Sequence, residues 1–134
     1  MRLVIVGCGR VGARLASLLD AEGHEVTIIN TNSDAFRRLD PGFNGNAIIG
    51  TGVDEDVLRR GGVDQADAFA AVTDDDNTNI MASQVARTIF GVKKVVTRIY
   101  DSTREDTYHA LGLETICPTT LGATRIKEVL RRQP

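Results

Sequence analysis

Short apolar runs alternate along this chain with longer segments that carry apolar residues on one helical face. The apolar runs predict six β-strands at residues 3–6, 26–29, 47–49, 68–72, 95–99 and 115–117. The segments after them predict helices at residues 11–22, 34–39, 55–60, 79–90, 104–111 and 121–130. This alternation is typical of parallel strands joined by helical crossovers, so the fold class is predicted to be α/β.

The order of elements predicts a Rossmann-like three-layer sandwich. We expect a six-stranded parallel sheet in the order 3-2-1-4-5-6, with helices on both faces and a ligand at the carboxyl ends of the first and fourth strands. In the fourth helix, a stripe of Met81, Val85 and Ile89, with Ala82 and Ala86 beside it, predicts a buried face. A length of 134 residues favours a single domain, residues 1–134.

A glycine-rich turn follows the first strand and opens the first helix, which is the context that a phosphate-binding G-x-G-x-x-G motif requires. The first glycine permits the tight bend, the second lets a pyrophosphate approach the backbone, and the third lets the helix pack on the sheet. Unpaired N–H groups at the helix start suit an anion. The residues predicted to bind the nucleotide here are Gly7, Cys8, Gly9, Arg10, Val11 and Gly12.

Asn30 stands at the end of the second strand, where a Rossmann domain normally has an acid that binds the ribose hydroxyls. Its amide oxygen can accept one such hydrogen bond, which is weaker than a bond to a carboxylate because the amide carries no charge. Asn30 also tolerates a 2′-phosphate better than a carboxylate would. The alternative is that Asn30 only shapes the turn that continues through Thr31 and Asn32.

The end of the fourth strand is polar and acidic, from Thr73 through Asp74, Asp75 and Asp76. We interpret these acids as caps of the following helix, since the glycine and distant glutamate of a calcium loop are absent. No metal site is predicted. Arg98 closes the fifth strand near the same edge, where a phosphate or a carboxylate of the acidic turn would pair with it.

Two residues inside the glycine turn allow more than one interpretation. Arg10 could meet a phosphate of the nucleotide or a neighbouring subunit, or be a solvated residue at the helix start. Cys8 could be a redox-sensitive thiol at a helix N-terminus, but a small residue that fits the turn is favoured. No arrangement of nucleophile and base stands out, so no catalytic residue is predicted.

Composition limits the classes of binding partner and the cellular compartment that we expect for this chain. The net charge of −2 argues against nucleic-acid binding. The sequence has no apolar run of the roughly 18 residues that a membrane span needs, so no membrane insertion is expected. Cys8 and Cys117 form no C-x-x-C pair, which indicates a reducing compartment, and the expected location is the cytoplasm.

Several motifs in order resemble one family. They are the G-x-G-R-x-G form of residues 7–12, the second-strand entry at 23–29, the segment 50–54, the T-x-x-D-x-x-N spacing of Thr73, Asp76 and Asn79, and Arg98-Ile99. Over nearly its whole length the chain resembles the N-terminal nucleotide-binding domain of TrkA-type potassium-uptake regulators, also called the RCK or KTN domain.

This resemblance implies a cytosolic regulatory subunit, peripheral to the inner face of the membrane, that controls a membrane potassium channel or transporter and catalyses no reaction. It implies NAD(H) as the ligand, or alternatively ATP or ADP. Subunits of the family form dimers, and a larger ring or a paralogous partner is also expected. The implied roles place Asn30 at the ribose, Thr51 and Gly52 near the adenine, and Thr73, Asp74 and Arg98 along the remaining edge. Thr31 is also predicted to bind the cofactor.

The chain departs from the family pattern at four positions. Asn30 and Asn32 replace residues that are usually acidic, and Thr51 and Val53 replace the usual Asp and Thr. The identity of the nucleotide therefore stays open. The small C-terminal sensing domain of the family is expected to be absent.

The last helix, at about residues 121–131, is expected to cross to a partner subunit. Its apolar stripe of Ile126, Val129 and Leu130 supports this, and the alternative is packing on its own sheet. Two other functions are weighed against regulation of potassium transport. One is the truncated cofactor domain of an NAD(P)-dependent oxidoreductase, and the other is a stand-alone redox or energy sensor.

Overall fold

The computed structural model describes residues 1–133. Its strands are β1 (Arg2–Val6), β2 (Glu25–Asn30), β3 (Asn46–Ile49), β4 (Ala68–Ala71), β5 (Lys94–Arg98) and β6 (Glu114–Ile116). Its α-helices are α1 (Arg10–Ala21), α2 (Glu55–Arg60), α3 (Asp76–Gln84), α4 (Glu105–Ala110) and α5 (Pro118–Arg131). Shorter helices are η1 (Ser33–Arg38), η2 (Val63–Gln65), η3 (Val85–Ile89) and η4 (Ser102–Arg104).

The strands form one parallel sheet in the order β3-β2-β1-β4-β5-β6, which confirms the predicted topology. From β1 the chain adds β2 and β3 on one side of the sheet and then β4, β5 and β6 on the other side, so β1 and β4 are the central pair. In a sheet of this kind ligands bind outside the carboxyl ends of the strands at this point.

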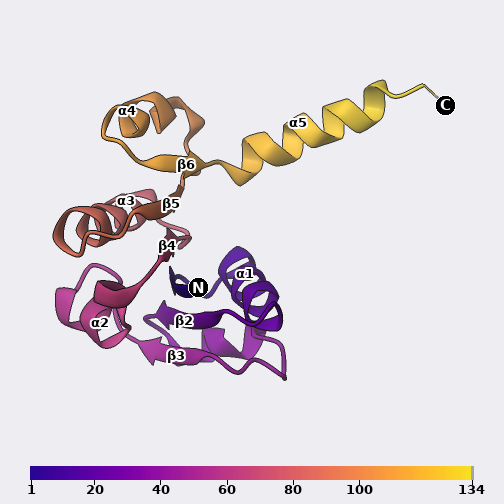
Figure 1. The fold of residues 1–134 in the computed structure, drawn as a ribbon. Coiled ribbons are helices and arrows are strands. Elements are labelled where there is room, and N and C mark those ends of the chain that lie inside the picture. The colour runs from indigo at the N-terminus through magenta and orange to yellow at the C-terminus, as the bar shows by residue number, and fades with distance from the viewer. Residues whose placement is uncertain (134) are drawn as a thin grey trace.

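Two apolar clusters hold helices against the two faces of the sheet, as predicted (Figure 1). Successive residues of β1 point to opposite faces, so Val4 and Val6 join the cluster under α2 and α3, whereas Ile5 joins the cluster under α1. Tyr108 of α4 belongs to a third, smaller cluster beside β5. The three layers of the sandwich follow from this alternation.

One part of the sheet lies beneath no helix of the described chain. On the face that carries α1, an apolar groove of about 320 Å³ runs over β4 and β5, between α1 and the start of α5. Instead of lying in this groove, α5 projects away from the sheet (Figure 1), and none of its residues is buried. Leu121, Ile126, Val129 and Leu130 are all exposed.

Two predicted helices differ from the observed ones. The segment predicted as a helix at 34–39 is the 3₁₀ helix η1, in which Asn32 caps the first turn through the Asp34 N–H at 2.9 Å. The segment predicted at 79–90 begins earlier, as α3, and ends in the π turn η3.

The predicted buried stripe on α3 is wrong for two of its three members. Met81 and Ile89 are each more than half exposed, whereas Ala82 and Ala86 are completely buried. The buried face is therefore built on the alanines, which let the helix lie close to β4 and β5. No helix within residues 1–133 is long and apolar enough to cross a membrane.

Candidate functional site

The carboxyl ends of the strands bring the predicted site residues to one edge of the sheet. The glycine turn follows β1, and its Gly7 N–H donates to the Ile29 carbonyl of β2 at 2.8 Å. On the other side, the Val72 N–H that follows β4 donates to the Val6 carbonyl at 2.8 Å. The turn therefore lies between the ends of β2 and β4, as the strand order requires.

The start of α1 presents backbone donors to this edge. Gly9 is its N-cap, and the first helical hydrogen bond runs from the Ala13 N–H to the Gly9 carbonyl at 2.9 Å. The N–H groups of Arg10, Val11 and Gly12 precede that bond and have no partner in the helix. No side chain within residues 1–133 caps this end, and the first turn contains no acid. Such an end favours an anion.

Each glycine of the turn has a distinct steric role. Gly7 has a φ of +107°, and a Cβ there would lie 2.7 Å from the backbone nitrogen of Thr73. A Cβ on Gly12 would collide with the carbonyl oxygen of Gly7. A Cβ on Gly9 would meet no atom within 4 Å among the described residues. Gly7 and Gly12 are thus required by the fold, whereas Gly9 faces open space.

Asn30 holds the glycine turn with its side-chain amide. Its Oδ1 accepts the Cys8 N–H at 3.0 Å, and its Nδ2 donates to the Asn32 carbonyl at 3.0 Å. The Cys8 N–H is consequently engaged and the phosphate donors are those of the residues after it. The structure thus gives Asn30 the turn-shaping role, while the second lone pair of Oδ1 can still accept a ribose hydroxyl.

Cys8 points into the protein. Its side chain is completely buried and its thiol donates to the Ala35 carbonyl at 3.3 Å. Burial raises the pKa of this thiol, and the nearby Arg38 charge opposes the effect only in part. A raised pKa lowers the thiolate fraction, so the favoured interpretation of Cys8 as a small residue that fits the turn agrees with the structure.

A fully buried amide, Asn79, connects the ends of β4 and β5. Its Oδ1 accepts the Thr73 N–H at 2.9 Å and the Thr73 hydroxyl at 2.6 Å. Its Nδ2 donates to the carbonyls of Thr73 and Arg98, each at 3.0 Å. Because Thr73 also contacts Gly7, one side chain fixes three parts of the site. The sequence pointed to Asn79 only through its motif spacing.

Of the three acidic residues after β4, only Asp75 has the predicted capping role in the described chain. Asp75 caps α3, since its Oδ2 accepts the Thr78 N–H at 3.1 Å and the Thr78 hydroxyl. Asp76 accepts the N–H groups of Tyr100 at 2.8 Å and Asp101 at 3.2 Å. These bonds attach the start of α3 to the chain that follows β5. Within residues 1–133 no group of three metal-binding side chains converges.

Replacing Asp75 with alanine is expected to lower the thermal unfolding midpoint at pH 7. The Thr78 hydroxyl, followed by its N–H, lowers the pKa of the Asp75 carboxyl below its usual range. A carboxyl whose pKa is lowered by folding stabilises the protein above its unfolded pKa, about 3.9, and this contribution disappears as the pH falls through the folded pKa.

The difference in midpoint between wild type and Asp75→Ala should therefore shrink as the pH is lowered from 5 to 3. Asp74→Ala is the matched control, because Asp74 is exposed and forms no hydrogen bond with the described residues. Thermal melts at each pH measure the effect. A difference that stays constant down to pH 3 would contradict the assigned role of Asp75.

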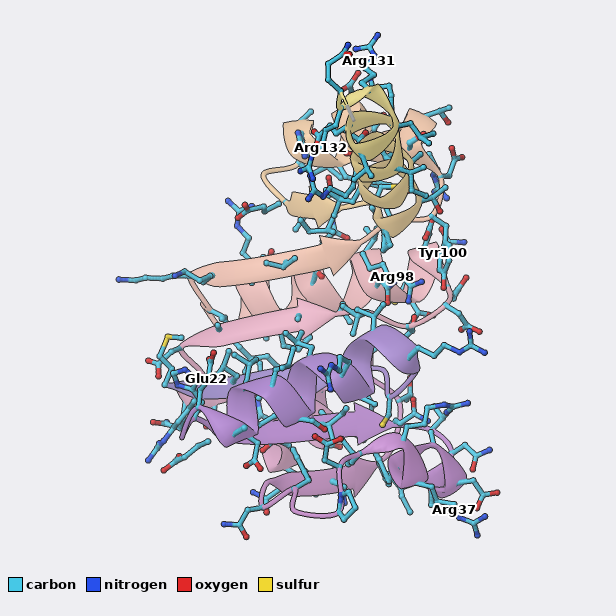
Figure 2. All side chains as sticks on the ribbon, turned by 90° about the vertical axis from the view of Figure 1, so that its right-hand side faces the viewer. Glu22, Arg37, Arg98, Tyr100, Arg131 and Arg132 are labelled. Carbon is cyan, nitrogen blue, oxygen red and sulfur yellow. The ribbon has the colours of Figure 1, made fainter. Side chains whose placement is uncertain are left out.

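Arg98 lies where the edge meets the apolar groove. Its guanidinium lies over the Tyr100 ring at 4.2 Å (Figure 2), and the side chain lines the groove together with Val11 and Pro118. Its Nε is buried and makes no hydrogen bond with any of residues 1–133. A buried guanidinium N–H group favours binding of a hydrogen-bond acceptor. The sequence predicted that Arg98 needs a partner but missed its stacking on Tyr100.

The other predicted site residues lie at the same edge with their side chains less constrained. Arg10, Thr31, Thr51 and Asp74 are exposed. Gly52 is buried, and a Cβ there would collide with the Val6 side chain. The chain after β3 therefore passes directly over the end of β1, beside the glycine turn.

A concavity larger than the apolar groove lies elsewhere. It measures about 970 Å³ and opens at the amino ends of the strands, around His24, Asn46 and Arg60. We assign the functional site to the carboxyl edge instead, because the uncapped helix, the open Gly9 position and the orphaned Arg98 nitrogen all lie there.

Comparison with known proteins gives a family match. The model of the TrkA-N domain matches residues 3–118. A relative from Streptomyces coelicolor, named Trk system potassium uptake protein TrkA, is 48% identical over 116 residues, which cover 87% of this chain and 52% of the relative. The chain thus spans about half of that relative's length, and less of several others.

Solved structures agree on the fold. The Kef C-terminal domain of Shewanella denitrificans in its AMP-bound form has a TM-score of 0.84 at 20% identity, covering 99% of this chain and 84% of that one. The GsuK channel bound to NAD has a TM-score of 0.80 at 24% identity, covering 96% of this chain and 23% of that one. At these identities the likeness concerns the fold alone.

Proposed function

We propose, from the premise that this chain belongs to the TrkA-N domain family, that it is a nucleotide-binding regulatory domain of a potassium-uptake system. Binding of the nucleotide would change the conformation of the domain and so control a membrane potassium channel or transporter, without catalysis by the chain. Residues 1–134 would act as one domain. The observation that carries the proposal is the uncapped start of α1 beneath the open Gly9 position.

The ligand in this proposal is an adenine nucleotide, NAD(H) in the first place and ATP or ADP as the alternative. Its phosphates would accept hydrogen bonds from the free N–H groups of Arg10, Val11 and Gly12. The ribose would lie beside Asn30 and Thr31, and the adenine over Thr51 and Gly52. Similar proteins are named for bound AMP, NAD and ADP, which supports an adenine nucleotide without deciding which.

Regulation requires two states that bind the ligand with different affinity. Arg98 and the start of α5 offer a physical connection, because Arg98 and Pro118 line the same groove that begins beside the glycine turn. A phosphate that accepts a hydrogen bond from the unpaired Arg98 Nε would draw this side chain out of the groove and toward the nucleotide. The position of α5 would then depend on the ligand.

The groove and α5 support a homodimer. The groove is apolar and uncovered, while Leu121, Ile126, Val129 and Leu130 are exposed on a helix that points away from it. A second copy of this chain would cover both, with α5 of each subunit lying in the groove of the other. Larger rings or a paralogous partner would build on this unit. The channel or transporter would hold the assembly at the cytoplasmic face of the membrane.

Titration calorimetry of the chain with NADH, NAD⁺, ATP and ADP tests the nucleotide part of the proposal. We expect saturable binding of at least one of the four at one site per chain. Absence of binding to all four, and to the 2′-phosphorylated dinucleotides as well, would contradict it. Potassium uptake at limiting external potassium, measured in cells whose chromosomal copy carries Gly9→Asp, tests the regulatory part, and an unchanged rate and nucleotide response would contradict that part.

The double substitution Ile126→Asp and Leu130→Asp is expected to convert a dimer into a monomer, because it places two charges on the exposed apolar stripe of α5. Thr124→Asp is the control, since two residues along a helix turn by about 200° and place that charge on the opposite side. Sedimentation velocity measures the mass. A wild-type chain that is monomeric at tens of micromolar, or a double variant that remains dimeric, would contradict the proposed contact.

A further inference from the structure

The ribose corner of the proposed site contains no carboxylate where such domains normally place one. Asn30 ends β2, and its amide is used twice within the protein, for the Cys8 N–H and the Asn32 carbonyl. In dinucleotide-binding domains the acid at this position pairs with the ribose 2′-hydroxyl, and an arginine nearby accommodates a 2′-phosphate instead. Asn30 brings no negative charge that would repel a second phosphate.

A guanidinium stands at the same corner. The Arg38 Nη1 donates to the Cys8 carbonyl at 3.3 Å, and Cys8 is the residue whose N–H is held by Asn30. This single bond places the cation beside the glycine turn and uses one of five N–H donors. Arg38 forms no ion pair with a carboxylate of residues 1–133, so its charge is free for a ligand.

The charged side chains of η1 sum to one positive charge. The nearest acid on η1 is Asp34, and its carboxylate faces Arg37 at 3.9 Å. Thr31 and Asn32 are neutral, and the Asn32 side chain is engaged by the Asp34 N–H. With Asp34 and Arg37 offsetting each other, Arg38 is the unbalanced charge. A guanidinium of this kind suits a phosphate monoester, which carries about −1.5 to −2 charges.

We infer that the nucleotide bound at this edge carries a phosphate on the 2′-hydroxyl of its adenosine, so that NADPH and NADP⁺ bind more tightly than NADH and NAD⁺, with Arg38 as the partner of that phosphate. The inference rests on the proposed nucleotide site and specifies its ligand. Asn30 favours NADP(H) because its neutral amide does not repel the 2′-phosphate. Arg38 favours NADP(H) because its positive charge attracts the 2′-phosphate, which NAD(H) does not have.

Calorimetric titration with NADPH and NADH, in the same low-salt buffer, tests the inference. We expect NADPH to bind about tenfold more tightly or better, because hydrogen bonds to charged groups have effects of this size. NADH binding as tightly as NADPH, or ATP or ADP binding while neither dinucleotide does, would overturn the inference and leave the proposed function standing. Failure of every nucleotide would overturn both.

Three variants assign the preference to its residues. Arg38→Gln should weaken NADPH about tenfold and leave NADH nearly unchanged. Arg37→Gln is the matched control, because Arg37 is the neighbouring guanidinium, pairs with Asp34 and points outward (Figure 2). Asn30→Asp can still accept the Cys8 N–H but loses the bond that Asn30 donates to the Asn32 carbonyl. Its carboxylate should reverse the preference in favour of NADH, provided that thermal melts show a folded variant. An unchanged ratio in both Arg38→Gln and Asn30→Asp would overturn the assignment.

Discussion

Replacing Gly9 with aspartate is expected to abolish nucleotide binding while the chain stays folded. Gly9 has a φ of −80°, which any residue adopts, and a Cβ there meets no protein atom within 4 Å. Aspartate is also a favoured N-cap, so the start of α1 should gain stability. The new carboxylate would lie where the phosphates approach and would repel them. At a separation of 4 Å this repulsion reaches about 4 kcal/mol.

Affinity should consequently fall at least about a hundredfold, which calorimetry with the tightest wild-type ligand measures. Gly12→Ala is the contrasting variant. Its Cβ would collide with the Gly7 carbonyl oxygen, so we expect a loss of roughly 3 kcal/mol or more in the free energy of unfolding. Thermal melts separate the two effects. Wild-type affinity in Gly9→Asp, or an unfolded Gly9→Asp chain, would contradict the assigned geometry.

Replacing Asn79 with alanine is expected to destabilise the protein by roughly 3 kcal/mol or more. The side chain is completely buried and makes hydrogen bonds to Thr73 and to the Arg98 carbonyl. Its removal leaves the N–H and carbonyl of Thr73 and the carbonyl of Arg98 without these partners. Urea denaturation measures the loss.

Asn77→Ala is the control for this variant, because Asn77 is exposed on the same helix and its side chain hydrogen-bonds only to Arg104 among the described residues. It should change the free energy of unfolding by less than about 0.5 kcal/mol. Where Asn79→Ala stays folded, it should also weaken nucleotide binding, since Thr73 supports Gly7. Equal stability of the two variants would show that Asn79 does not fix the edge of the sheet.

The strand order was predictable because each strand is a short apolar run separated by one crossover, and the crossover rules leave few topologies. The buried face of α3 was not. The prediction assumed that the largest apolar residues would point inward, but the close approach of α3 to the sheet admits only small ones, Ala82 and Ala86. The start of α5 was placed three residues late, because Pro118 at the first helical position was not used as a start signal.

The site was predictable in outline and not in its contacts. The glycine spacing located the phosphate turn, since the motif needs only a strand before it and a helix after it. The spacing could not reveal that the Asn30 amide accepts the Cys8 N–H. It also could not reveal that Arg38, at the far end of η1, donates a hydrogen bond to the Cys8 carbonyl of the same turn. These contacts depend on the path of the chain between β2 and β3, which is irregular and has no sequence period.

The measurement that tests the central claim most directly is a two-dimensional ¹H–¹⁵N NMR spectrum of the chain, recorded while the tightest nucleotide is added. We expect the shifted amide signals to cluster at residues 9–12, 30–31, 51–52, 73–74 and 98, which lie along the carboxyl edge of the sheet. Signals that shift instead around His24, Asn46 and Arg60, at the opposite edge, would contradict it, and so would a spectrum that no adenine nucleotide changes.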